Sequence, residues 1–320
     1  MKRSTRLFFA VVVLSGVLAG PADAQQPAPP PPFQIPTALP TALPTLPTAL
    51  PTGALPSPGL LVPLVGSAAM QSEVRKVLDD LIAHLTTTYA SRVRGMPLKF
   101  DPDATEINAY AGCDQQGKPF LAGTEGLLEA VLAIAETRSC DELDQAQSYD
   151  AYMKAVLPTL QAQKPGSPQL PPNVVPSQCM VDLRVLSHAH ELFDDIVAFT
   201  FGHELAHHYM GHTGCAINDS PFTQGLAAVE HLGQVLVPAV NQPNEIVADN
   251  VGLFDVMDTG RAHLPGYEYT EKGGLLLLDF FAKLEGSGSG LTAFSRSHPP
   301  STIREGWVKS AALLWRLQHP

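Results

Sequence analysis

The stretch Phe201-Gly-His-Glu-Leu-Ala-His-His-Tyr-Met-Gly-His212 places four histidines and one glutamate within twelve residues. His203 and His207 are four residues apart, so on an α-helix both imidazoles project from the same face, as two ligands of one tetrahedral zinc ion would. Glu204 is rotated by about 100° from His203, and its carboxylate can reach a water beside the ion without binding the ion. The pattern therefore predicts two metal ligands and a general base on one helix. The alternative is a histidine pair that is solvated or satisfied within the core.

A catalytic zinc site has three protein ligands and one open position, so a further ligand is expected elsewhere in the chain. The segment Asn244-Glu-Ile-Val-Ala-Asp249 offers Glu245 and Asp249 on one face of a predicted helix. Glu245 can bind the metal, while Asp249 can accept a hydrogen bond from a ligating imidazole and fix its orientation. The alternative is an exposed acidic helix start, where such residues are common. Because the two motifs complement each other, we predict one zinc ion per chain, held by His203, His207 and Glu245.

The hydrophobic pattern beyond residue 67 predicts one α+β domain, mainly helical with a small β-sheet, over residues 68–320. Thr124 is a candidate N-cap, and Pro158 is expected to end its helix. Residues 97–112 predict a hairpin or two strands, and the proline-rich residues 164–177 predict a loop. The predicted helices cover residues 70–90, 124–139, 141–161, 182–213, 222–237, 243–258, 270–285 and 301–318.

The N-terminal part of the chain has the composition of an export signal followed by a linker. Basic residues precede the apolar run 7–20, and small residues follow at 21–24, which predicts a signal peptide over residues 1–24. An uncleaved anchor is the alternative. Residues 25–67 repeat a Leu-Pro-Thr-Ala unit that cannot build a core, so we expect a disordered proline-rich tether. A pro-segment, or a docking ligand for a partner in the cell envelope, is the other interpretation. The predicted location is periplasmic or secreted.

Charge and cysteine content narrow the functional classes. The net charge of −11 argues against nucleic acids and anionic membranes as partners, since both favour basic surfaces. In an oxidising compartment the four cysteines are expected to form disulfides, with three pairings open, and no Cys-x-x-Cys spacing suggests a cysteine zinc site. A disulfide at Cys215 could hold the end of the histidine helix. The four are Cys113, Cys140, Cys179 and Cys215.

Several motifs together resemble a known family. HELAH (203–207) followed by EIVAD (245–249) is similar to the gluzincin endopeptidases, and more closely to peptidase family M48, of the HtpX, Ste24 and Oma1 type. INAYA (107–111) resembles that family's Asn-Ala-Phe/Tyr-Ala strand, and SHPPSTIRE (297–305) resembles its His-Pro-x-x-x-x-x-Arg ending. The resemblance covers residues 70–318 with the motifs in family order. It implies a zincin-like metallopeptidase domain.

The resemblance also implies a reaction and roles. The expected activity is a zinc-dependent endopeptidase that hydrolyses peptide bonds with a metal-activated water, for which Glu204 is the general base. His298 is implied as a catalytic group that stabilises the oxyanion or shapes the pocket, and a turn histidine before Pro299 is the alternative. Arg304 is expected to fix packing or to form an internal ion pair. The expected edge strand, which pairs with a peptide or protein substrate, consists of Asn108, Ala109, Tyr110 and Ala111.

The chain also departs from the family pattern. Cys113 and the following DQQGK stand where a glycine-rich hairpin is usual, and residues 139–188 form an insertion that could be a lid, a plug or a partner surface. No membrane-spanning segment is expected after signal cleavage, because the apolar run 273–284 is too short and reads as a core helix. The soluble, exported branches are therefore the better comparison. The competing function is a catalytically silent zinc-binding scaffold or chaperone-like exported protein. A nucleophilic hydrolase lacks a Gly-x-Ser-x-Gly motif.

Overall fold

The computed structural model describes residues 60–162, 164, 168–215, 242–264, 266–287 and 298–319. The chain divides into two units, Met1–Ala54 and Leu55–Pro320, and all of the described residues belong to the second. The predicted signal peptide, nearly all of the predicted tether and the predicted helix 222–237 lie outside these ranges.

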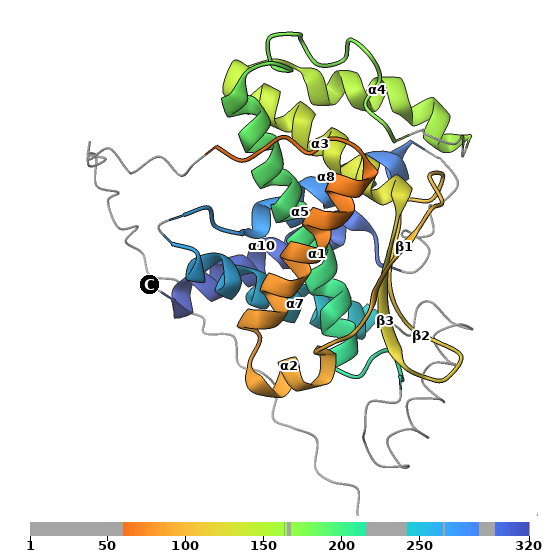
Figure 1. The fold of residues 1–320 in the computed structure, drawn as a ribbon, viewed down its shortest axis with the longest axis vertical. Helices are drawn as coiled ribbons and strands as arrows, with labels where there is room; N and C mark the ends of the chain where they lie inside the picture. Colours follow the sequence, from red (N-terminus) through yellow and green to blue (C-terminus); the bar gives the residue numbers. More distant parts are fainter. Residues whose placement is uncertain are drawn as a thin grey trace, which may run out of the picture. The chain divides into compact units, whose positions relative to one another are not determined.

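The second unit is mainly helical, with a single long helix, α5 (Leu183–Tyr209), at its centre (Figure 1). Asp182 begins α5, because its carboxylate accepts a hydrogen bond from the Arg184 amide at 2.9 Å. Most of α5 is buried, and α1, α3, α7 and α8 all pack against it. The other helices are α1 (Ser67–His84), α2 (Thr87–Val93), α3 (Glu125–Asp144), α4 (Ser148–Gln161), α7 (Gln242–Ala262), α8 (Glu271–Gly286) and α10 (Ser301–Gln318).

A three-stranded sheet lies beside the C-terminal half of α5 (Figure 1). Its strands are β1 (Leu98–Asp101), β2 (Ala109–Cys113) and β3 (Pro119–Thr124), in the order β1-β3-β2. Two strands were predicted within residues 97–112, and β1 and β2 begin there. The alternative of a hairpin between them is wrong, because both pair with β3, β1 in parallel and β2 in antiparallel fashion.

A tight turn makes β3 the partner of β2. The carboxylate of Asp114 accepts hydrogen bonds from the amides of Gln116 and Lys118, at 2.9 and 2.8 Å. Gly117 adopts a φ of 76°, which a residue without Cβ tolerates. The DQQGK segment therefore closes a hairpin between β2 and β3. The strand β3 was not predicted from the sequence.

The end of α3 and the start of α4 differ from the prediction. Helix α3 continues past residue 139 to Asp144, where Gln145 takes a left-handed conformation with φ of 54°. The carboxylate of Asp141, on the last turns of α3, accepts hydrogen bonds from the amides of Ser148 and Tyr149 at 2.6 and 3.1 Å. Asp141 therefore serves as the cap of α4 and is not part of it.

The predictions for two other helix ends have different outcomes. Thr124 is the N-cap of α3, as predicted, and its hydroxyl accepts from the Leu127 amide at 3.2 Å. Pro158 was expected to end α4, but the helix continues to Gln161. The predicted core helix 273–284 corresponds to α8, whose apolar side chains are largely buried.

The described part of the insertion 139–188 packs on α3 and lies at the end of α5 opposite to β2 (Figure 1). A disulfide between Cys140 and Cys179 ties the end of α3 to the segment before α5. The second disulfide joins Cys113 to Cys215. Two disulfides are typical of an oxidising, exported environment. Within the described ranges, no helix is both long enough and apolar enough to span a bilayer.

Candidate metal centre

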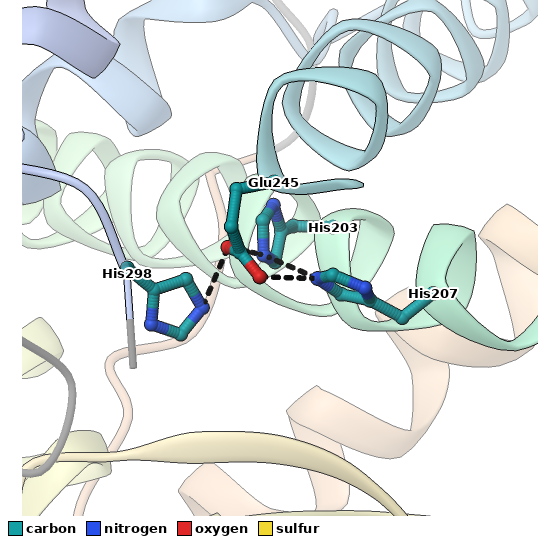
Figure 2. A group of neighbouring side chains, drawn as sticks. All are labelled: His203, His207, Glu245 and His298. Atoms are coloured by element: carbon teal, nitrogen blue, oxygen red, sulfur yellow. Dashed lines mark hydrogen bonds and ion pairs between the residues drawn. The ribbon is translucent and has the colours of Figure 1, made fainter. Parts of the chain in front are cut away.

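Four side chains from three parts of the chain converge beside α5 (Figure 2). The Nε2 atoms of His203 and His207, on successive turns of α5, lie 3.0 Å apart. Glu245, in the first turn of α7, places Oε2 3.3 Å from His203 Nε2 and Oε1 3.3 Å from His207 Nε2. The Nε2 atom of His298 lies 3.2 Å from Glu245 Oε2. The structure thus brings together the three predicted ligands and adds His298 to the same group.

The separations between these atoms match those of a metal site. A tetrahedral ion with bonds of about 2.0–2.1 Å holds its ligand atoms about 3.3 Å apart. The observed separations are 3.0 to 3.3 Å, and the cluster is largely buried. Glu245 Oε2 is buried and accepts no hydrogen bond, although two imidazole nitrogens face it. A buried carboxylate oxygen without a donor is costly unless a cation faces it, so the donor set fits zinc.

Asp249 and Arg304 hold the His203 ring on its Nδ1 side, which faces away from the cluster. His203 Nδ1 donates to Asp249 Oδ1 at 2.9 Å, which leaves Nε2 facing the cluster. Arg304, on α10, donates from Nη2 and Nε to the two oxygens of Asp249 at 2.6 and 2.9 Å. Burial opposes the charge on Asp249, but the neighbouring guanidinium lowers its pKa below the usual range. Asp249 therefore orients the imidazole as predicted, and Arg304 forms the predicted internal ion pair.

Glu204 lies beside the cluster without joining it. Its Oε2 accepts a hydrogen bond from the backbone amide of Ala111 in β2 at 2.8 Å. The side chain is buried, and burial raises its pKa above the usual carboxyl value, although His203 and His207 act in the opposite direction. A carboxylate with a raised pKa, held beside a metal site, has the properties expected of a general base.

The strand β2 presents one edge towards Glu204. Asn108 O accepts from the Thr124 amide at 3.0 Å, so Asn108 and alternate residues after it face β3. In an antiparallel ladder the intervening Ala109 and Ala111 then direct their amides to the opposite edge. The hydrogen bond from Ala111 to Glu204 confirms this orientation. Within the described sheet β2 is an edge strand, as the predicted substrate strand should be.

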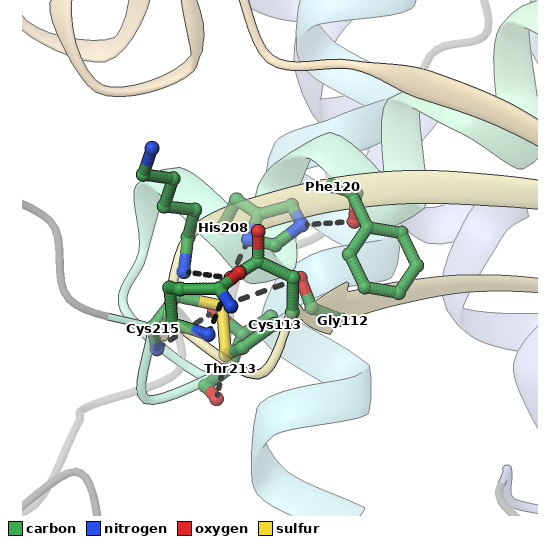
Figure 3. The surroundings of a disulfide bond; sticks show 9 residues. Gly112, Cys113, Phe120, His208, Thr213 and Cys215 are labelled. Carbon is green, nitrogen blue, oxygen red and sulfur yellow. Dashed lines mark hydrogen bonds between the residues drawn. A yellow bond between two sulfur atoms is a disulfide. The ribbon is translucent and has the colours of Figure 1, made fainter.

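The remaining two histidines of the opening stretch have separate roles. His208 is fully buried against β3, with Nε2 2.9 Å from the Phe120 carbonyl oxygen (Figure 3). Burial lowers its pKa to about 4, so the ring is neutral. His212 places Nδ1 3.2 Å from Nδ1 of His207, so it lies next to one of the predicted ligands.

The Cys113–Cys215 disulfide fastens the end of the histidine helix to the edge strand (Figure 3). Cys113 is the last residue of β2, and Cys215 follows the turn after α5. The sulfur of Cys215 also lies 3.3 Å from the carbonyl oxygen of Gly112. The disulfide therefore limits the movement of β2 relative to the end of α5, which carries His207, and to the following turn, which carries His212.

Two glycines allow α5 and α7 to approach closely. A Cβ placed on Gly252 would lie 2.7 Å from the carbonyl oxygen of Gly202 and 2.9 Å from the amide of His203. Backbone contact at this crossing brings the start of α7, with Glu245, up to His203. The role of Gly252 could not be predicted from its own segment, because its contact is with another helix.

A comparison of the chain with models of protein families, with curated proteins and with solved structures found no match.

Proposed function

We propose that the protein is a zinc-dependent endopeptidase of the gluzincin type, similar to peptidase family M48. The observation that carries the proposal is the convergence of His203, His207 and Glu245 on one point beside the buried carboxylate of Glu204. Their sequence spacing and the 3.0 to 3.3 Å separations agree with a single ion. Zinc, when bound there, would polarise the scissile carbonyl and lower the pKa of a water.

The chain's own groups account for the proton movements of this reaction. Glu204 accepts a proton from the attacking water and returns it to the leaving amine. The hydrogen bond from Ala111 fixes the carboxylate on the side of β2. Asp249 and Arg304 keep the His203 ring in the orientation that leaves Nε2 available.

The edge of β2 is the proposed binding surface for substrate. An extended peptide could add to this edge through backbone hydrogen bonds, and Glu204 would lie next to it. The peptide bond to be cleaved would then be held between the edge strand and the histidine pair. The proposed segment comprises Asn108, Ala109, Tyr110 and Ala111.

Export, to the periplasm or beyond the cell, belongs to the same proposal. The two disulfides support an oxidising compartment. The N-terminal signal peptide and the proline-rich tether remain proposals from the sequence, as does an envelope partner for the tether.

The fourth group, His298, favours a second candidate function. A structural zinc site has four protein ligands, whereas a catalytic one keeps a position open. Burial lowers the pKa of His298 to about 3, so its imidazole is neutral and Nε2 can bind metal. If His298 were a permanent ligand, the protein would be a catalytically silent zinc-binding scaffold. If it instead contacts the substrate oxygen, the site is catalytic.

The decisive experiment compares metal content and cleavage in the same preparations. Tag-free protein is assayed on casein and on a peptide library, with a chelator, and after zinc is restored. We expect chelator-sensitive cleavage that Glu204→Gln abolishes without loss of bound zinc. Glu129→Gln on α3 makes the same change away from the site and should keep full activity. Bound zinc without chelator-sensitive cleavage would favour the scaffold, and a chain that binds no zinc at these residues would refute both candidates.

A further inference from the structure

A second cluster of metal-binding residue types lies between α1 and the N-terminal half of α5. Glu73 comes from α1, and His190 and Asp194 come from successive turns of α5. These residues are only 9%, 8% and 7% exposed. Neither the proposed reaction nor the opening motif uses any of them.

The geometry of this cluster is close to that of a metal site. His190 Nε2 lies 3.5 Å from Glu73 Oε1 and 3.7 Å from Asp194 Oδ2. These values exceed by only a few tenths of an ångström the separation of about 3.3 Å for a tetrahedral ion with bonds of 2.0–2.1 Å. One ligand atom from each of the three side chains lies within 4.8 Å of the other two, so side-chain rotations would bring all three to one ion.

Two buried atoms in the cluster lack hydrogen-bond partners. These are His190 Nε2 and Asp194 Oδ1. An unpaired polar atom in the interior destabilises a fold unless something compensates it, and here both belong to side chains that can bind metal. Buried atoms without hydrogen-bond partners occur elsewhere in the described structure as well, but here they coincide with three metal-binding residue types.

The orientation of the His190 ring supports the same interpretation. His190 Nδ1 lies 2.6 Å from the carbonyl oxygen of Val62, an acceptor, so Nδ1 carries the proton. Nε2 therefore faces the cluster, and in the neutral ring its lone pair points there. Burial acts to lower the pKa of His190, but Glu73 and Asp194 raise it overall, so an ion that binds here must displace the Nε2 proton. Metal-binding histidines are commonly held by such a bond from the other ring nitrogen to a carbonyl.

Lys76 does not fill the cluster, because it contacts the other side of Glu73. Its Nζ lies 2.6 Å from Glu73 Oε2, whereas Oε1 faces His190. One carboxylate oxygen of Glu73 is thus neutralised by the lysine, and the second remains oriented towards His190 and Asp194.

The second cluster is separate from the first. His190 and His203 are thirteen residues apart on α5. At 1.5 Å and 100° per residue, this spacing corresponds to about 20 Å along the helix and about 220° of rotation. The two clusters therefore lie on nearly opposite faces of α5, one against α1 and the other against α7.

We propose that Glu73, His190 and Asp194 bind a second divalent transition-metal ion, with zinc as the best match to one imidazole and two carboxylates. This ion joins α1 to α5 and, through the bond from His190 to Val62, also holds the segment that leads into α1. It has no part in the proposed hydrolysis. A water would complete its coordination.

The test measures how many zinc ions each chain binds. The tag-free, metal-depleted protein is dialysed against micromolar zinc, and the bound zinc is then counted by elemental analysis. We expect two zinc ions per chain for the wild type and one for Asp194→Asn or Glu73→Gln. His207→Ala, in the first cluster, should also retain one ion, and its combination with Asp194→Asn should retain none. His188 lies on the same helix outside the cluster, so the control variant His188→Ala should retain two zinc ions. Circular dichroism of the metal-free proteins identifies any variant that fails to fold.

The outcomes separate the two sites. A wild-type chain that binds one ion, which Asp194→Asn and Glu73→Gln both retain, would refute the second site and leave the proposed peptidase site intact. A single ion that is lost in these variants but retained in His207→Ala would support the second site and refute the first. Thermal unfolding gives a second, independent measurement. An ion that binds only the folded chain raises its Tm, so zinc should raise the Tm of His207→Ala but not that of the double variant with Asp194→Asn.

Discussion

The ion pair between Arg304 and Asp249 allows a quantitative test of how the site is supported. Both side chains are almost fully buried, at 1% and 0% exposure, and the two bonds measure 2.6 and 2.9 Å. Arg304→Met removes both donors and leaves a buried carboxylate with only His203 as a partner. Loss of one member of a buried pair typically costs about 3–5 kcal/mol. We therefore expect the free energy of unfolding of the metal-free protein to fall by that amount.

The same substitution should weaken zinc binding. Asp249, without its guanidinium, no longer holds the His203 ring in one orientation. Loss of such supporting groups typically lowers metal affinity 10–100-fold, or about 1.4–2.7 kcal/mol. The stability effect is measured by urea denaturation in chelator, and the affinity effect by competition with a chromogenic zinc chelator.

A double-mutant cycle tests the reasoning. Asp249→Asn combined with Arg304→Met removes both charges, so it should recover much of the stability lost in Arg304→Met alone. Arg316→Met breaks an exposed pair with Glu271, since Arg316 is 50% exposed, and should cost less than about 1 kcal/mol. If Arg304→Met cost no more than Arg316→Met, or if the double variant were as unstable as the sum of its parts, the pair would not support the site as described.

Three further predictions concern packing, crosslinking and pH. Gly252→Ala should cost about 1–3 kcal/mol and weaken zinc binding, because its Cβ would meet Gly202 at 2.7 Å; unchanged zinc affinity would contradict this. Replacing Cys113 and Cys215 by serine opens a loop with a separation of 102 residues and should lower stability by about 2–4 kcal/mol in denaturation. Burial raises the pKa of Glu136 to about 7, so its ionisation destabilises the fold as the pH rises from about 4.5 through 7. Glu136→Gln should therefore be more stable than the wild type by about 1–3 kcal/mol at pH 8 and equal to it at pH 4; a difference independent of pH would contradict this assignment.

Local sequence signals predicted most of the described helices, because apolar periodicity and caps act within a few residues. The predicted helix 70–90 is an exception, since α1 ends at His84 and α2 begins at Thr87. The predicted helix 301–318 agrees with α10, and Thr124 begins α3 as its type and position suggested. The strand β3 was missed for the opposite reason. It is a short segment, Pro119–Thr124, whose pairing with both β1 and β2 depends on the turn that precedes it.

The metal centre was predictable in part. The spacing of His203 and His207 sets their common face on any helix, so no tertiary information was needed. The position of Glu245 next to the two histidines was predicted by combining two complementary motifs. His298 lies just before α10 and outside that helix, so its direction could not be predicted from periodicity, and the structure places it with the ligands.

The second cluster shows which signal was overlooked. His190 and Asp194 have the same spacing of four residues as His203 and His207. Glu73, however, comes from another helix, and nothing in its own segment marks it as a partner. The contact exists because α1 packs against α5.

The buried polar groups of α5 explain why this helix positions so much of the molecule. Apolar contacts are non-directional, whereas a buried hydrogen bond fixes both partners at one place. Four neighbouring elements are attached by such a bond, from Glu204 to β2, His208 to β3, His203 to α7 and Asp195 to the start of α8. In the two clusters, by contrast, the described structure leaves buried oxygen and nitrogen atoms without hydrogen-bond partners. On α5 these atoms are His190 Nε2 and Asp194 Oδ1, and in the first cluster the atom is Glu245 Oε2 on α7, which faces His203 of α5. A bound cation would compensate all three, and this is the common physical argument for both proposed sites.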